Sequence, residues 1–419
     1  MMKKLLLTIM LPCAALVGHA QGGNTGMGGE DGDYQSLAER LAKVEKKHNM
    51  LDVYINFATS AQAEENGGTW QSRFANKDLR LELKGKLTDK IFYRFRHRLN
   101  RRNDAKGVDK FSKATDIMMV GYHLSRKVTL MGGKMAQAYG GYEYDANPMY
   151  VHQYSDMLDH MSIFQTGAAV SIRPLSSQEL VLMVSNNDNA TLDEELGENA
   201  YKVGSSGYEQ LEQAKNPLAL MVNWNGNFLD DQLQTRWAWG IQKVASGNYA
   251  RLLTLGQRLN LPKVQWELDY MGSFDDMDHL GIATDDVADF LQPTIYYADG
   301  FYTEFIYQPP YYYSMNLHCG KTHYNTWITK LDWQFAPQWN LMLKGTYETV
   351  SLPQSDRFND YRKSIGLQGA LEYYPDKTQD LRVFLAYWGK HVHFSDKSLL
   401  ANRHTNRLEL GLMYRIKCY

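Results

Sequence analysis

The sequence is poor in cysteine and has no apolar run long enough for a membrane helix. Its 419 residues include three cysteines, of which Cys13 lies in an apolar N-terminal segment, which leaves Cys319 and Cys418. Two cysteines are too few for a disulfide framework in a chain of this length. Elsewhere no apolar run reaches the ~18 residues that a spanning helix needs. The mean hydropathy of −0.48 excludes a helical membrane bundle but is compatible with a β-barrel, whose lumen and loops are polar.

Signatures of catalysis and metal binding are also missing. The sequence has no GxSxG, HExxH, CxxC or Walker-type GK[ST] pattern. The histidines of HCGKTH (318–323) lack the ligand spacing of a zinc site, and the acidic run 275–286 matches no calcium-loop spacing. We therefore predict that the chain is not an enzyme and holds no cofactor or metal. Its 45 basic against 47 acidic residues argue against nucleic acid as a partner.

The N-terminus has the pattern of a secretory signal, with Lys3 and Lys4 before the apolar stretch 5–17. We predict a signal peptide over 1–20, cleaved near Ala20, and a flexible Gly-rich linker over 21–33. Residues 34–51 carry about two heptads, which predict a short helix. This helix is either a simple amphipathic periplasmic helix or a trimerising coiled coil; its apolar seam is Leu37, Leu41, Val44, His48 and Leu51.

From residue 52 onward the pattern alternates with period 2 and predicts an all-β domain over 52–419. In the segment 74–87, leucines at 79, 81 and 83 face one way and charged residues at 78, 80, 82 and 84 the other. We predict about 16 strands, as in a transmembrane antiparallel β-barrel. The expected ranges are 51–62, 74–87, 91–102, 114–124, 126–136, 161–173, 178–187, 216–226, 231–244, 249–260, 262–273, 321–335, 338–350, 361–374, 379–392 and 404–416.

The connections between these strands alternate between short and long. Turns such as 88–90 and 227–230 are short, whereas segments such as 63–73, 102–113, 137–160, 188–215 and 274–320 are long. This alternation is typical of a membrane barrel with tight periplasmic turns and longer outside loops. A further hairpin at 294–307 would either project outside the membrane or add two strands, and we favour projection.

The strand 91–102, IFYRFRHRLNRR, has three arginines on one face. Arg94, Arg96 and Arg98 share one parity, while the other parity is aromatic and aliphatic. A strand between lipid and a water-filled lumen tolerates such a basic face. We predict that these arginines line a pore, since guanidinium groups suit carboxylates and phosphates.

Several segments resemble the phosphate-selective porins O and P, in the form common in Bacteroidetes. The resemblance covers about residues 37–419 and rests on the coiled-coil-like start, on VTLMGGK (128–134) running into AYGGYEYDANP, on FQTGAAVSI (164–172) and on the C-terminal GLMYRI. It implies a 16-stranded, trimeric pore in which an inward-folded third loop sets the constriction. Members of the family that bind phosphate carry Lys and Arg in and around that constriction.

The corresponding loop in this chain departs from that pattern. Residues 136–172 contain no Lys or Arg, and the acidic residues Glu143, Asp145, Asp156 and Asp159 lie there instead. We hypothesise that 137–160 folds inside and that its carboxylates face the arginine strand, with Lys134 at the lip, as a mixed-charge constriction. The alternative is that the acids are solvated outside. The loop aromatics either contact sugar rings or pack the loop against the wall; they include Tyr139, Tyr142 and Tyr144.

The sequence thus predicts an outer-membrane porin that gives passive diffusion to small hydrophilic solutes or anions. The expected partners are outer-membrane lipid and two further copies of the chain in a homotrimer. The alternatives are a structural or adhesin-like surface barrel and a sugar-preferring channel. Phosphate specificity stays open because of the acidic loop.

Overall fold

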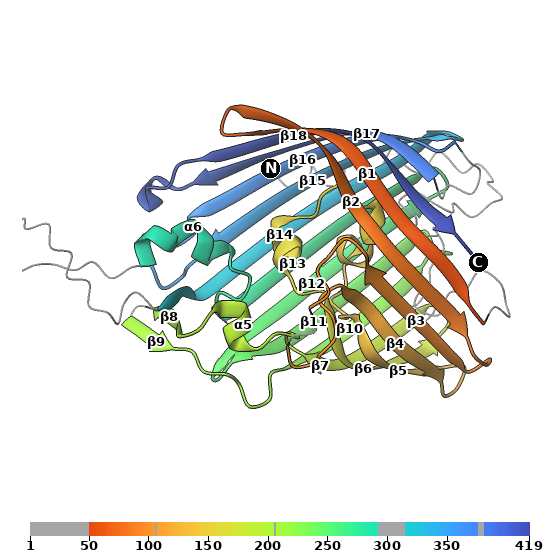
Figure 1. Cartoon of the computed structure of the whole chain (residues 1–419), viewed down its shortest axis with the longest axis horizontal. Coiled ribbons are helices and arrows are strands. Elements are labelled where there is room, and N and C mark those ends of the chain that lie inside the picture. The colour runs from red at the N-terminus through yellow and green to blue at the C-terminus, as the bar shows by residue number, and fades with distance from the viewer. Residues whose placement is uncertain (1–49, 105–106, 205–206, 292–314, 376–380) are drawn as a thin grey trace, which may run out of the picture.

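The computed structural model describes residues 50–104, 107–204, 207–291, 315–375 and 381–419. Its described part contains 18 strands, of which 16 close an antiparallel barrel by pairing β1 with β18 (Figure 1). The barrel strands are β1 (Asp52–Asn66), β2 (Thr69–Lys86), β3 (Ile91–Arg98), β4 (Thr115–His123), β5 (Val128–Ala136), β6 (Phe164–Leu175), β7 (Gln178–Asn186), β10 (Leu218–Phe228), β11 (Leu233–Ala245), β12 (Asn248–Leu261), β13 (Val264–Met277), β14 (Asn316–Ala336), β15 (Trp339–Ser351), β16 (Arg362–Tyr373), β17 (Leu381–Phe394) and β18 (Arg403–Lys417).

The remaining elements lie in the long connections. The third one, between β5 and β6, holds α3 (Tyr142–Asp145), η3 (Pro148–Tyr150) and α4 (Asp156–His160); α5 (Leu192–Leu196) and the hairpin β8 (Ala200–Gly204) with β9 (Gly207–Gln210) follow β7. Helix α6 (Ile282–Leu291) follows β13, and η5 (Asp396–Ser398) follows β17. In Figure 1, α5, α6, β8 and β9 lie at one end of the barrel, and the turn that joins β2 to β3 lies at the other. Within the described ranges no helix is long and apolar enough to cross a membrane.

All 16 expected strands are present, so the all-β barrel prediction is confirmed. The expected long connection at 63–73 is wrong. There β1 and β2 continue as one hairpin to a tight turn at Gly67 and Gly68, whose φ angles are +59° and +86°. The strands stay paired through this extension, and Arg73 forms an ion pair with Glu64 at 3.0 Å. The predicted signal, linker and helix, up to residue 49, and the hairpin at 294–307 lie outside the described residues.

The two faces of the wall differ as the alternation predicted. Outward residues such as Leu367, Leu385 and Leu410 are large, apolar and exposed. The opposite parity is polar and buried, for example Asn56 on β1 and Glu82 on β2. This arrangement places lipid outside and charged groups in the lumen.

The wall is uneven in height. Strands β3, β4, β5 and β7 have only 8, 9, 9 and 9 residues, whereas β14 has 21. A tilted strand needs about 9–11 residues to span a bilayer. The β3–β7 side is therefore the low side of the barrel.

Candidate functional site

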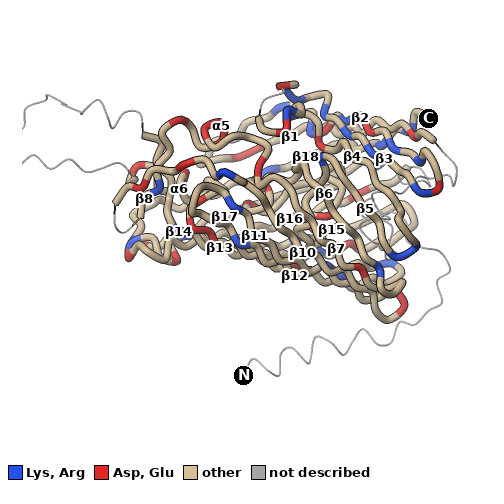
Figure 2. Tube along the Cα trace, turned by 90° about the horizontal axis from the view of Figure 1, so that it is seen from below, with Lys and Arg blue, Asp and Glu red and all other residues tan. Residues whose placement is uncertain are grey.

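The three predicted arginines share the lumen face of β3. Arg94 bonds Glu82 of β2, with an N–O distance of 2.6 Å, and Arg96 lies over the Phe164 ring, 5.0 Å from its centroid. The side chains differ in solvent exposure, since that of Arg98 is 25% exposed and that of Arg96 only 4%. Figure 2 shows Lys and Arg concentrated along β2 and β3. Arg98 is the member of the group that water reaches most readily.

A single buried carboxylate holds this group together. Asp116 lies 3.0 Å from Arg80, 3.2 Å from Arg96 and 2.8 Å from Arg98. The pairing register shifts beside it, because Arg96 opposes Ile117 and the next residue, His97, opposes Thr115. This bulge inserts one extra residue, Asp116, whose side chain joins the arginine cluster.

The loop between β5 and β6 folds into the lumen and is fixed there by wall carboxylates. Asp269 of β13 accepts hydrogen bonds of 2.8 Å from the backbone N–H groups of both Tyr142 and Glu143. Glu348 of β15 accepts bonds of 3.0 and 3.2 Å from the N–H groups of Asp156 and Met157. The first N–H groups of α3 and α4 have no partner within their helices. The wall carboxylates Asp269 and Glu348 therefore cap the two helices.

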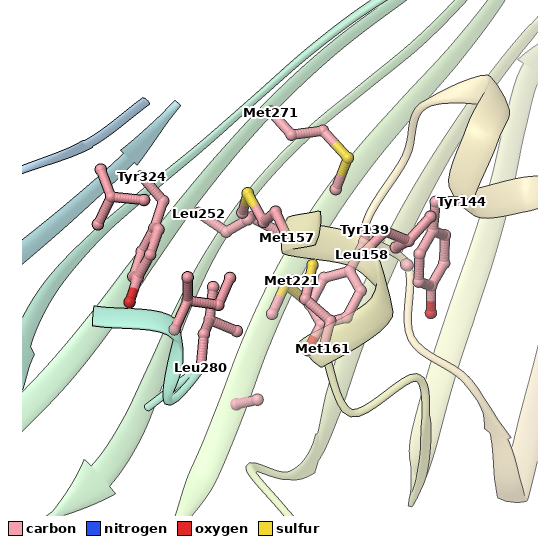
Figure 3. Packing of buried hydrophobic residues seen from close by; sticks show 14 of the residues in the cluster. Tyr139, Tyr144, Met157, Leu158, Met161, Met221, Leu252, Met271, Leu280 and Tyr324 are labelled. Carbon is pink, nitrogen blue, oxygen red and sulfur yellow. The ribbon is translucent and has the colours of Figure 1, made fainter. Parts of the chain in front are cut away.

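Apolar packing supports the same position of the loop. Met157 and Leu158 of α4, and Met161 directly after it, belong to one buried cluster with the wall residues Met221 and Leu252. Figure 3 shows α4 lying against the strands with these side chains turned toward them. The loop therefore lies inside the barrel, packed against the wall strands.

The direction of the loop carboxylates corrects the prediction. Glu143 pairs with Lys344 of β15, Asp145 lies 3.0 Å from Arg236 of β11, and Asp156 pairs with Arg362 of β16 (2.7 Å) and with Lys390 of β17. These cations belong to β11, β15, β16 and β17, and none belongs to the arginine strand β3. The sequence could not reveal this, because the partners lie 91 to 234 residues away in the chain.

Asp159 is the exception among the four acids. It is exposed and lines the same cavity as Arg80 and Arg98, and its carboxylate accepts a hydrogen bond of 2.7 Å from the Gln153 amide. Partial burial and the nearby carboxylates of Glu143 and Asp156 raise its pKa. One loop carboxylate thus faces the arginines across open space.

The three predicted loop tyrosines are packed between the loop and the barrel wall. Tyr142 lies between two guanidinium groups, 4.4 Å from Arg236 and 4.2 Å from Arg258, and Tyr139 accepts a 2.7 Å bond from Gln242. Tyr144 donates to the Ile163 carbonyl at 3.1 Å. All three tyrosines are buried, and burial raises their pKa values. The packing interpretation is favoured over sugar contact.

The open space left beside the loop is a cavity of about 640 Å³. Arg80, Arg98 and Asp116 line its strand side, and Tyr154 and Asp159 its loop side. Lys134 lines it as well, and its ammonium lies 3.6 Å from Asp109. Six basic and five acidic side chains surround the cavity, so its charge is nearly balanced; they are Arg80, Arg98, Arg101, Arg102, Lys113 and Lys134 against Asp104, Asp109, Asp116, Asp159 and Asp188.

Sequence reasoning missed most of these cavity residues. Arg80 lies in the alternating segment 74–87, but only the pairing of β2 with β3 shows that it neighbours Arg98. Asp116 begins an apolar segment and carries no motif. The described residues contain no cluster of three or more side chains that could hold a metal.

The barrel, the inward loop and the charged lumen define an outer-membrane porin, which is a non-enzymatic channel. The model of the family "Phosphate-selective porin O and P" matches residues 53–416, and the chain belongs to this family. The resemblance to this family seen in the sequence is thereby confirmed. No curated protein matches the sequence significantly.

Solved structures of porins share the fold at very low sequence identity. DcaP of Acinetobacter baumannii is 10% identical, with 90% of this chain and 100% of that chain covered and a TM-score of 0.56. OmpT of Vibrio cholerae is 8% identical, with 89% and 99% covered and a TM-score of 0.53. OmpF of Salmonella typhi, in complex with daunomycin, is 12% identical, with 89% and 99% covered and a TM-score of 0.53.

Proposed function

We propose that this porin gives passive diffusion to small hydrophilic solutes and ions through the cavity between the arginine strand and the inward loop. The single observation that carries the proposal is the near balance of six basic and five acidic side chains around 640 Å³ of open space. A pore with fixed charges of both signs orients polar solutes and hinders apolar ones. The small basic excess favours anions weakly.

Strict phosphate selection is a weaker candidate, although the family name contains it. The inward loop contributes no cation, and Asp116 already engages three of the arginines. A phosphate in this cavity would compete with that carboxylate for the same guanidinium groups. We therefore propose general diffusion with a mild anion preference, ahead of phosphate specificity, sugar preference or a structural role.

Planar-bilayer recording in a salt gradient tests this proposal. Arg98→Ala should lower the chloride-to-potassium permeability ratio about two- to fivefold, as expected for one unit charge in wet surroundings. Lys90→Ala removes the same charge from an exposed turn at the far end and should leave the ratio unchanged. If replacing Arg94, Arg96 and Arg98 together alters neither conductance nor selectivity, these arginines are not at the constriction.

We also propose a homotrimer. Strands β3, β4 and β5, with 8, 9 and 9 residues, are at or just below the lower limit of the about 9–11 residues that a spanning strand needs. A neighbouring copy would cover this low side. One structure of V. cholerae OmpT is described as its trimer form; it is 10% identical, with a TM-score of 0.51. Native mass spectrometry of the purified protein should give three chains per particle.

For the N-terminal region we propose a signal over 1–20, a linker over 21–33 and a helix over 34–51, ahead of the barrel domain 52–419. The support is the sequence pattern of charges, glycines and heptads. N-terminal sequencing of the protein from membranes should start at Gln21. A start at Met1 would contradict the proposed cleavage.

A further inference from the structure

The outward faces of β16 and β17 change character at the end that carries the long connections. Along β17, Leu385 and Tyr387 are exposed and apolar, and His391 and His393 continue the same parity beyond them. On β16, Ile365 and Leu367 are exposed, and Lys363 follows at the outer end. The lipid-facing surface therefore ends in a basic patch, defined here as Lys363, His391 and His393.

The register brings the three residues of the basic patch together. Lys363 pairs directly with His393, and His391 lies opposite Ile365, two residues along the same strand. Directly opposed residues have Cβ atoms about 5 Å apart, and residues two apart on a strand face the same side about 6.6 Å apart. One anionic group can therefore reach all three nitrogen-bearing side chains.

The basic patch differs from the lumen in its lack of internal partners. Arg362 and Lys390, on the opposite face of the same two strands, both bond Asp156. In the part of the chain that the structure describes, by contrast, no hydrogen bond or ion pair involves the side chain of Lys363, His391 or His393. The neighbouring His404 is already paired with Glu65 at 3.1 Å and is therefore left out of the patch.

We propose that the basic patch binds phosphorylated headgroups of lipids in the surrounding membrane leaflet. The location of the basic patch indicates a lipid headgroup as its ligand. The patch continues the apolar surface that meets the acyl chains and lies just beyond the aromatic side chain of Tyr387. Tyrosines at this level mark the membrane interface. An ammonium and two imidazoles supply charge-assisted hydrogen bonds that suit a phosphate group. The inference concerns the outer surface and does not depend on the proposed pore selectivity.

Native mass spectrometry of the whole protein with added lipid tests the inference. Phosphatidic acid, whose headgroup is a phosphate monoester, should stay bound at least threefold more than phosphatidylcholine. Replacement of Lys363, His391 and His393 by Ala should remove that preference, while Lys397→Ala, an exposed charge in the connection after β17, should not. A high-salt wash should weaken the retention, since exposed charges are screened.

Three outcomes would overturn the inference. They are equal retention of phosphatidic acid by the triple variant and the parent protein, an equal loss in Lys397→Ala, and a change in subunit number in the triple variant. The last would show that the basic patch contacts another copy of the chain instead of lipid. Conductance recorded on the same samples separates this inference from the pore function, because the patch faces away from the lumen and current should be unchanged.

Discussion

Asp116 is the residue on which the charge of the cavity depends most. It is 2% exposed and the only residue in the described structure that bonds Arg80, Arg96 and Arg98 together. Asp116→Asn should leave three guanidinium groups without their shared counter-charge and raise the permeability ratio in favour of chloride about two- to fivefold. The reversal potential in a KCl gradient measures this change, which is opposite in sign to that of Arg98→Ala.

The control for this prediction is Asp276→Asn. Asp276 bonds Arg251 at 3.2 Å near the rim, and neither residue lines the cavity. Asp276→Asn removes one negative charge, as Asp116→Asn does, but outside the cavity. It should leave the reversal potential unchanged. An equal shift in both variants would mean that the overall charge, rather than Asp116, sets selectivity.

At the scale of elements, the inward loop is held by groups that respond to pH. The buried imidazole of His152 lies 2.9 Å from Glu372 and close to Arg382 and Lys77. Burial lowers the pKa of His152 to about 4, although Glu372 opposes this shift. The docked loop therefore requires neutral His152.

This shift predicts that acid weakens the docking of the loop. A free histidine gains its proton near pH 6.5, whereas docked His152 resists protonation until about pH 4. Above pH 6.5 the free energy of loop docking does not depend on His152. As the pH falls from 6.5 to 4, docking becomes less favourable by up to about 3 kcal/mol. Single-channel recordings should show more current fluctuation at pH 4 than at pH 7.

His152→Gln separates this residue from other groups that titrate in acid. Glutamine keeps an N–H donor for Glu372 but cannot take up a proton. The variant should stay quieter than the parent protein at pH 4 and behave like it at pH 7. Fluctuations that grow equally in both proteins would show that another group controls the loop.

The elements also show how far the sequence determines the structure. Alternation located every barrel strand because a wall between lipid and water requires period 2 in each strand. It failed at 63–73, because the outward-facing residues of β2 switch from even to odd positions at a bulge opposite Ala58 and Thr59. The loop's inward path was expected from the family resemblance, but its ion pairs were not. Those depend on which strands face each other across the closed barrel, and no local pattern encodes that.

At the scale of the whole molecule, the uneven wall bears on assembly. The outward residues of the low side are as apolar as those of the tall side, with Val120 on β4 49% exposed and Val383 on β17 39% exposed. If another copy covers the low side, a cation there would be buried between subunits, whereas a cation on β17 would meet only lipid.

Substitution by arginine at these two positions tests the arrangement. Both variants should lose stability by about 2–4 kcal/mol if the site lies near the bilayer midplane, because each places a charge on an apolar face. Only Val120→Arg should also dissociate the trimer, since a charge without a partner at a buried interface costs several kcal/mol more. Native mass spectrometry in mild detergent gives the subunit number. A trimer that survives Val120→Arg and dissociates in Val383→Arg would place the subunit contact on the tall side instead.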